Sequence, residues 1–272
     1  MKIDTFFAKH PVFRYEEFAN FMKERGIAHP ASVRQQLSYY HKAGRLLHLR
    51  RMLYAVKPAG LETEDHWVDP YLIAAKASKE SVLAYHTALE LHNLAYTIFE
   101  ELTYLCNHTK KSFQFQNQTY RSVIVPKSLV MNKVSDTGIL TIQHQGLEIK
   151  ITNLERTIVD VLDRPDLAGG WEEVLRSLEH VIQINTDQLI KYTLLLNNAA
   201  TVAKVGYYLE LRPSHLKTNQ QFTKKLLDHI PKQPYYMDRN NRGKGTYIKK
   251  WQLIVPNKTI EQQWEEPNDS DV

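Results

Sequence analysis

Two adjacent arginines, Arg50 and Arg51, stand between two short apolar segments, Leu46–Leu49 and Leu53–Val56. The apolar segments are typical of the two strands of a β-hairpin, which places the arginines in the turn between them. Turns usually prefer Gly, Asn or Asp. A guanidinium group is suited instead to bidentate contact with phosphate, or to a narrow minor groove of DNA. The pair therefore indicates a hairpin whose tip lies against nucleic acid.

A second group of polar side chains precedes the hairpin. Val33, Leu37 and Tyr40 have the spacing of one buried helix face, and we expect a helix that is capped by Ser32 and closed by Gly44. The opposite face carries side chains that can read base edges, since glutamine pairs with adenine and arginine with guanine in the major groove. The candidate DNA-binding residues are Ser32, Arg34, Gln35, Ser38, Tyr39, Lys42, Arg45, Arg50 and Arg51.

Two earlier helical segments complete the elements that would position these side chains. Apolar residues at helical spacing include Phe6 and Phe7 in the first segment and Phe18 and Phe21 in the second. Three helices followed by a hairpin is the order of a winged helix-turn-helix, whose third helix enters the major groove. The alternative is a small three-helix interaction domain with an ordinary charged hairpin.

The excess of basic residues lies in the same part of the chain as these candidate DNA-binding residues. Residues 1–60 hold 11 Lys and Arg against 4 Asp and Glu, whereas the remaining residues hold 24 against 26. A small basic region points toward a polyanionic partner, although a basic surface can also serve solubility alone.

The rest of the chain predicts a larger domain of mixed composition. Residues 57–70 contain two prolines and four acidic residues and are typical of a linker. After it, ESVLAYHTALELHNL predicts a helix, alternating runs predict strands, and YYMDRNNRGKGTYIKKWQLIVP predicts a closing β-hairpin. We therefore expect an α+β protein with an N-terminal winged helix-turn-helix at 1–58, a linker at 59–68, a mixed α/β domain at 69–264 and a disordered acidic tail at 265–272.

Motifs for catalysis are weak. The segment RGKGT has its glycines on both sides of the lysine, which is not the order of a phosphate-binding P-loop. Glu148 and Lys150 could end a nuclease-like pattern, but no aspartate precedes them on an obvious partner strand. The single cysteine, Cys106, excludes an internal disulfide and a CxxC metal site. No catalytic residue, metal site or cofactor is predicted, and the sequence gives no case for an enzyme.

The sequence also gives no sign of a membrane. No apolar run approaches the length of a membrane span, and the first residues lack a signal-peptide core. We expect a cytoplasmic protein without a membrane partner.

Several segments together resemble a known family. They are SVRQQLSYYHKAGRLLHLRRMLYAV, DPYLIAAK, AYHTALELHNL, ITNLERTIVDVLDRPDLAGGWEEVL and KWQLIVP, and the likeness covers about residues 1–260. In these segments the chain resembles the AbiEi-family antitoxins of bacterial AbiE (type IV) toxin–antitoxin and phage-defence systems. One residue departs from the family pattern, because Met52 stands where the wing usually has glycine, and a turn with positive φ would strain it.

The resemblance implies two roles. The winged helix would repress the chain's own operon by binding double-stranded promoter DNA at inverted repeats, and the larger domain would counteract a nucleotidyltransferase-like toxin without forming a stable complex. Two alternatives stay open. One is a free-standing transcriptional regulator whose C-terminal domain senses a ligand or partner, and the other is a DNA-acting nuclease that uses Glu148 and Lys150.

Overall fold

The chain folds into two compact units, each built from helices and strands. The computed structural model describes residues 2–57, 67–108, 110–211, 220–239, 242–257 and 259. The first unit comprises Met1–Leu83, Glu100–Ile124 and Leu140–Ile151, and the second comprises Ala84–Phe99, Val125–Ile139 and Thr152–Val272. The expected α+β class is thus confirmed. None of the described helices combines the length and the apolar character that crossing a bilayer requires.

The domain boundaries expected from the sequence remain a prediction. The compact units follow a different division, because strands far along the chain belong with the first 83 residues. Residues 59–66 of the expected linker and the whole expected tail at 265–272 lie outside the described residues.

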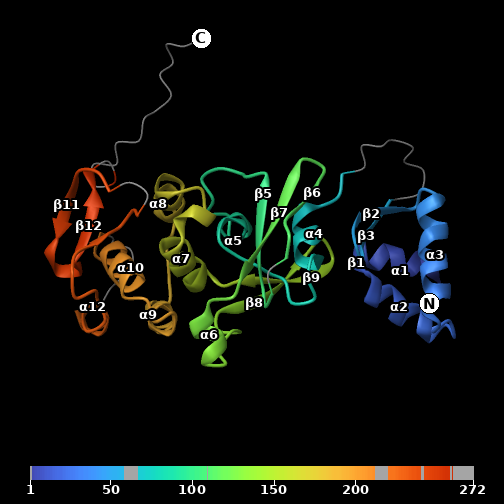
Figure 1. Ribbon diagram of the computed structural model, residues 1–272, viewed down its shortest axis with the longest axis horizontal. Helices are drawn as coiled ribbons and strands as arrows, with labels where there is room; N and C mark the ends of the chain where they lie inside the picture. Colours follow the sequence, from blue (N-terminus) through green and yellow to red (C-terminus); the bar gives the residue numbers. More distant parts are fainter. Residues whose placement is uncertain are drawn as a thin grey trace, which may run out of the picture. The chain divides into compact units, whose positions relative to one another are not determined.

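The N-terminal part of the first unit has its own small sheet and its own core (Figure 1). Its elements are α1 (Ile3–Lys9), β1 (Val12–Arg14), α2 (Tyr15–Glu24), α3 (Pro30–Lys42), β2 (Leu46–Arg50) and β3 (Leu53–Val56). Strand β3 lies between β1 and β2 and pairs antiparallel with both. A cluster of buried aromatic rings, with Phe6, Phe13 and Phe18 at its centre, fills the space between the sheet and the helices. Sequence patterns predicted all of these elements except β1.

The start of α3 differs from the expectation. The helix begins at Pro30 and is capped by His29, whose Nδ1 accepts a hydrogen bond from the backbone N–H of Ala31 at 3.3 Å. Proline suits the first helical position because its missing N–H would have no partner there. Ser32 therefore lies inside the first turn rather than at the cap.

The hairpin turns at Arg51 and Met52, whereas Arg50, which the sequence placed in the turn, is the last residue of β2 and pairs with Leu53. Met52 has φ of 67°, so this turn keeps the left-handed conformation even though the residue is not glycine. The register shifts between His48 and Arg50, and the carbonyl of Met52 accepts a hydrogen bond from the backbone N–H of Tyr15 at 3.0 Å. These contacts hold a backbone conformation that is unfavourable for methionine by about 1 kcal/mol.

The larger sheet of the first unit has the strand order β6-β7-β5-β4-β9-β8. Its strands are β4 (Val82–Leu83), β5 (Glu101–Cys106), β6 (Phe113–Phe115), β7 (Gln118–Ile124), β8 (Ile139–His144) and β9 (Leu147–Thr152), and helix α4 (Pro70–Lys76) precedes them. The long helix expected over ESVLAYHTALELHNL is wrong. That segment forms β4, bends at Tyr85 with φ of 55°, and only then begins α5 (His86–Leu91).

The second unit is mainly helical and ends in a small sheet. Beside α5 it contains α6 (Lys127–Met131), α7 (Leu154–Asp163), a 3-10 turn (Pro165–Leu167), α8 (Trp171–Glu179), α9 (Thr186–Leu195), α10 (Ala199–Leu211) and α12 (Gln220–Leu227). Asn197, with φ of 50°, separates α9 from α10. Figure 1 shows α10 beside the closing strands.

The closing strands do not form the hairpin that the sequence predicted. Strand β12 (Leu253–Pro256) lies between β10 (Tyr235–Tyr236), which is parallel to it, and β11 (Gly245–Ile248), which is antiparallel. The fully buried ring of Trp251 packs on α10 at Gly206, where a Cβ atom would lie 2.1 Å from the ring. Only glycine permits this approach.

Candidate nucleic-acid interface

One face of α3 carries most of the residues that the sequence selected for DNA contact. Val33 and Leu37 point into the core, as expected, and anchor the helix. The opposite face is exposed along its length, and we call it the α3 face: it consists of Arg34, Gln35, Ser38, Tyr39 and Lys42. Tyr39 alone is 63% exposed, which is high for a large aromatic side chain.

The polar side chains of the α3 face have no partner among the residues that the structure describes. Within the described part of the chain, those of Arg34, Gln35, Ser38 and Lys42 make neither a hydrogen bond nor an ion pair. Their donors and acceptors are therefore available to another molecule. No acidic side chain shares the helix, because the sequence from Pro30 to Lys42 contains none.

Two of the other selected residues are less available. Ser32 is half-buried. The Arg45 guanidinium donates to the carboxylate of Asp4 at 2.7 Å and lies 5.1 Å from the centre of the Phe7 ring. Arg45 thus joins the end of α3 to α1, and a contact with DNA would compete with that ion pair.

The two arginines of the hairpin have different surroundings. Arg51 is exposed at the turn. Arg50 is half-buried, and its guanidinium lies 4.7 Å from the centre of the Phe113 ring on the larger sheet of the same unit. Burial raises the pKa of Tyr104 on that sheet, and the charge of Arg50 opposes this shift. The sequence brought the two arginines to the tip together, but Arg51 is the one that faces solvent.

The weaker candidates for chemistry are not brought together into a site. Glu148 and Lys150 are both exposed on β9, and Glu148 accepts a hydrogen bond from Gln143 at 3.3 Å. Within the described ranges no group of three His, Cys, Asp or Glu side chains could hold a metal ion. Gly245 and Thr246 of the RGKGT segment belong to strand β11 rather than to a loop before a helix.

The segment LERTIVDVLDRPDLAGG of the family resemblance builds a buried polar network in the second unit. Arg156 is fully buried, and its guanidinium donates to the carbonyl oxygens of Ser135 at 2.9 Å and Thr137 at 2.7 Å. The same guanidinium lies 3.4 Å from the carboxylate of Asp160, which accepts a hydrogen bond from the Tyr192 hydroxyl at 2.6 Å. Burial raises the pKa of Asp160 to about 6, against the opposing effects of Arg156 and Tyr192. Asp160 thus has a structural role, because its carboxylate connects Arg156 of α7 to Tyr192 of α9.

The segment AYHTALELHNL supplies a second buried polar group. The imidazole of His86 lies between two carboxylates, 3.2 Å from Glu90 and 3.1 Å from Glu173, and stacks on the Phe99 ring. Burial alone would raise the pKa of Glu173, but hydrogen bonds from Thr97 and His86 outweigh it and lower that pKa. The arrangement fixes the chain at Tyr96–Thr97, whose backbone N–H groups donate to Glu173.

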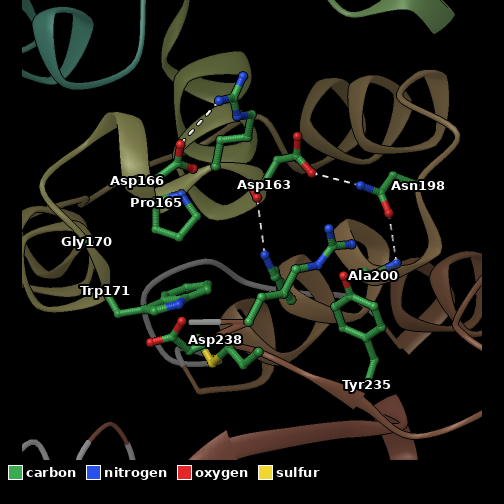
Figure 2. A pocket seen from close by; sticks show the side chains of 13 residues that line it. Asp163, Pro165, Asp166, Gly170, Trp171, Asn198, Ala200, Tyr235 and Asp238 are labelled. Atoms are coloured by element: carbon green, nitrogen blue, oxygen red, sulfur yellow. Dashed lines mark hydrogen bonds and ion pairs between the residues drawn. The ribbon is translucent and has the colours of Figure 1, made fainter. Parts of the chain in front are cut away.

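Sequence reasoning missed a cavity in the second unit. It has a volume of about 520 Å³ and is lined by residues of the α7–α8 connection, the start of α10 and the chain around β10 (Figure 2). Lys204 is its buried cation. The available signal was a lysine within an otherwise apolar stretch of helix, AATVAKVGYYL, where a charged side chain needs an explanation.

The fold and the surface together define an α+β protein with an exposed, basic helix face near its N-terminus, whose polar side chains have no partner in the described part of the chain. No protein-family model and no curated protein matches the chain. Among solved structures it is similar to the RV2827C protein from Mycobacterium tuberculosis, with a TM-score of 0.58 and 15% sequence identity over 92% of this chain and 89% of that one. At this identity the likeness concerns the fold, which the two chains share over nearly their whole lengths.

Proposed function

We propose that residues 2–57 form a winged helix-turn-helix that binds double-stranded DNA, with α3 in the major groove and the β2–β3 hairpin as the wing. The observation that carries the proposal is the α3 face, whose polar and basic side chains have no partner among the described residues. The order of elements and the sheet order β1-β3-β2 support it, since they leave this face of α3 outside the core. The basic composition of residues 1–60 gives the region the sign of charge that DNA requires.

The side chains divide by role. Arg34, Gln35 and Ser38 would contact base edges, because they precede Tyr39 and Lys42 on the exposed face and recognition helices use their N-terminal residues for this. Tyr39, Lys42 and Arg51 would contact phosphates. Arg45 and Arg50 are engaged within the protein, so their contribution would be smaller.

We further propose that the chain is an antitoxin and autorepressor of a type IV toxin–antitoxin operon. This rests on the resemblance to the AbiEi family, and the residues of the resembling segments include the two buried networks of the second unit. These networks use their charges inside the protein. Charges that are buried in the protein are not available to bind a toxin. This agrees with an antitoxin that acts without forming a stable complex with its toxin.

DNA binding is tested by fluorescence anisotropy with a duplex from the promoter upstream of the chain's own gene and a scrambled duplex of equal length. We expect the wild type to prefer the promoter. The triple variant Arg34→Ala, Lys42→Ala and Arg51→Ala should lose this binding and flatten the dependence of log K on log salt by about 0.9 for each lost phosphate contact. Replacing three exposed lysines outside the first sixty residues, Lys111, Lys127 and Lys191, removes the same charge and should leave the slope unchanged. Equal losses in the two triple variants would reject the α3 face as the interface.

The antitoxin role is tested by growth. When the neighbouring gene is induced, we expect growth arrest and rescue by this chain expressed from an independent promoter. The triple variant Arg34→Ala, Lys42→Ala and Arg51→Ala should still rescue growth, although it no longer represses the operon. A neighbour that is not nucleotidyltransferase-like, or arrest that the chain does not relieve, would overturn this role and leave a free-standing regulator.

A further inference from the structure

The cavity in the second unit has the properties of a ligand site rather than of a packing gap. Its volume of about 520 Å³ falls within the roughly 300–1,000 Å³ that is usual for small-molecule pockets. Its walls come from three separate parts of the chain, represented by Asp163, Lys204 and Tyr235. We call it the Lys204 pocket.

The ammonium group of Lys204 is buried with few partners. The residue is 6% exposed, and of the three N–H groups of the ammonium one donates to the carbonyl oxygen of Asp163 at 3.2 Å. Its Nζ lies 5.1 Å from the centre of the Trp171 ring. The pKa of Lys204 is lowered to about 8, because burial and, to a smaller extent, the charge of Arg239 outweigh the opposing effects of Asp163, Asp238 and Asp166.

The Tyr235 hydroxyl is a second donor of the pocket. Its oxygen is inaccessible to solvent and makes no hydrogen bond to any described residue. In Figure 2 this hydroxyl points away from β10 toward the wall that holds Asp163 and Asn198, with Trp171 on the other side. The guanidinium of Arg239 lies 5.0 Å from the centre of the Tyr235 ring, so a second cation of the pocket stands over this ring.

The acceptors of the pocket are largely in use. The carboxylate of Asp163 accepts hydrogen bonds from the side chains of Asn198 and Thr201. Asp166 pairs with Arg164 at 3.2 Å. Asp238 has an interaction of its own within the protein. The pocket therefore offers free donors, from Lys204 and Tyr235, with few free acceptors, and a buried donor without a partner is costly.

We propose that the Lys204 pocket binds a small phosphorylated molecule, with its phosphate oxygens accepting hydrogen bonds from Lys204, Tyr235 and Arg239. A phosphate monoester fits this set because it brings several acceptor oxygens and negative charge to donors from two walls. The volume leaves room for an organic group beyond the phosphate, so the ligand is larger than the ion alone. This inference stands apart from the proposed DNA-binding and antitoxin roles and would hold if either failed.

The test uses the full chain and three probes: phenyl phosphate, inorganic phosphate and benzoate. Isothermal titration calorimetry and thermal unfolding should show saturable binding of phenyl phosphate, weaker binding of inorganic phosphate, and the weakest binding of benzoate, which lacks the third terminal oxygen. If benzoate binds tightly and neither phenyl phosphate nor inorganic phosphate binds, the choice of a phosphorylated ligand is overturned.

Two variants tie the binding to the pocket. Lys204→Met keeps the length of the side chain and removes the charge, so it should lower the affinity for phenyl phosphate at least about tenfold. The same variant should unfold at a temperature no lower than the wild type, because a poorly solvated charge is gone. Tyr235→Phe removes only the hydroxyl and should lower the affinity about threefold to tenfold.

Lys191→Met is the matched control, because Lys191 is exposed on α9 of the same unit. It should bind phenyl phosphate as the wild type does. The same affinity in the wild type, Lys204→Met and Tyr235→Phe, or no saturable binding to the wild type, would reject the proposal. If Lys204→Met fails to fold, the comparison of Tyr235→Phe with the wild type decides it.

Discussion

Arg34 of α3 and Arg156 of α7 are the same side chain in opposite settings. Arg34 is exposed and has no partner among the described residues, whereas Arg156 is fully buried with hydrogen bonds to two carbonyl oxygens and a nearby carboxylate. The comparison shows that an exposed arginine is available to bind another molecule, whereas a buried one is not. On α3 the basic side chains of Arg34 and Lys42 have no partner among the described residues, whereas Arg156 of the second unit serves the fold.

The largest expected effect comes from removing the buried charge. Arg156→Met should lower the free energy of unfolding by about 3–5 kcal/mol, because Asp160 loses its cation and two buried carbonyl groups lose their donor. The matched variant Arg34→Met should stay within about 0.5 kcal/mol of the wild type, as exposed substitutions usually do. Urea denaturation measures both. Similar losses of unfolding free energy in the two variants would show that the buried Arg156 stabilises the fold no more than the exposed Arg34 does.

The pH dependence of stability should sharpen the comparison. An aspartate in the unfolded chain has a pKa of about 3.9. Since the pKa of Asp160 in the folded state is raised to about 6, the folded state binds more protons than the unfolded state between these values. The stability that this group contributes is therefore fully present below the unfolded pKa and is lost as the pH rises through about 6.

Asp160→Asn removes this titration. We expect the variant to flatten the curve of unfolding free energy against pH between about 4 and 6, by roughly 2–3 kcal/mol over the interval. Asp136→Asn is the control, because Asp136 is exposed in the same unit, and it should leave the curve as in the wild type. A wild-type curve that rises over this interval, and that Asp160→Asn leaves unchanged, would contradict the raised pKa.

The sequence predicted the N-terminal elements well because their patterns are local. Helical spacing of Phe6, Phe18 and Leu37, and the two arginines between apolar segments, depend on neighbours within a few residues. Strand β1 was missed because its three residues become a strand only by pairing with β3, far along the chain. The closing sheet was misread for the same reason, since β10 pairs with β12 rather than with the nearer β11.

The sites show the same limit. The α3 face could be predicted, because the residues opposite a buried stripe are known once the stripe is known. Arg156 and Asp160 have the spacing of an exposed i,i+4 helix pair, and only the packing of the surrounding chain buries them. The Lys204 pocket joins residues more than 30 positions apart, and no local pattern brings Tyr235 to Lys204.

Base reading by the α3 face is expected to have an intermediate effect. Gln35→Ala or Arg34→Ala should relax the preference at one or two operator positions, by about 1–3 kcal/mol for each lost base contact, and leave nonspecific affinity largely intact. Competition with duplexes mutated one base pair at a time measures this. Lys23→Ala, an exposed lysine of α2, is the control and should keep the full preference. Parallel loss of specific and nonspecific binding would assign Gln35 and Arg34 to the DNA backbone instead.

The smallest effect separates the two neighbouring arginines of the wing. Arg51 is exposed, so Arg51→Ala should remove one phosphate contact and reduce the slope of log K against log salt by about 0.9. Arg50 is half-buried beside Phe113, so Arg50→Ala should change the slope less. It should also raise the pKa of Tyr104, because the cation that opposes the effect of burial is removed. Salt titrations of the two single variants, each beside the wild type, measure the slopes. A larger change for Arg50 than for Arg51 would mean that Arg50 leaves Phe113 when DNA binds, and that burial in the free protein does not decide which arginine contacts phosphate.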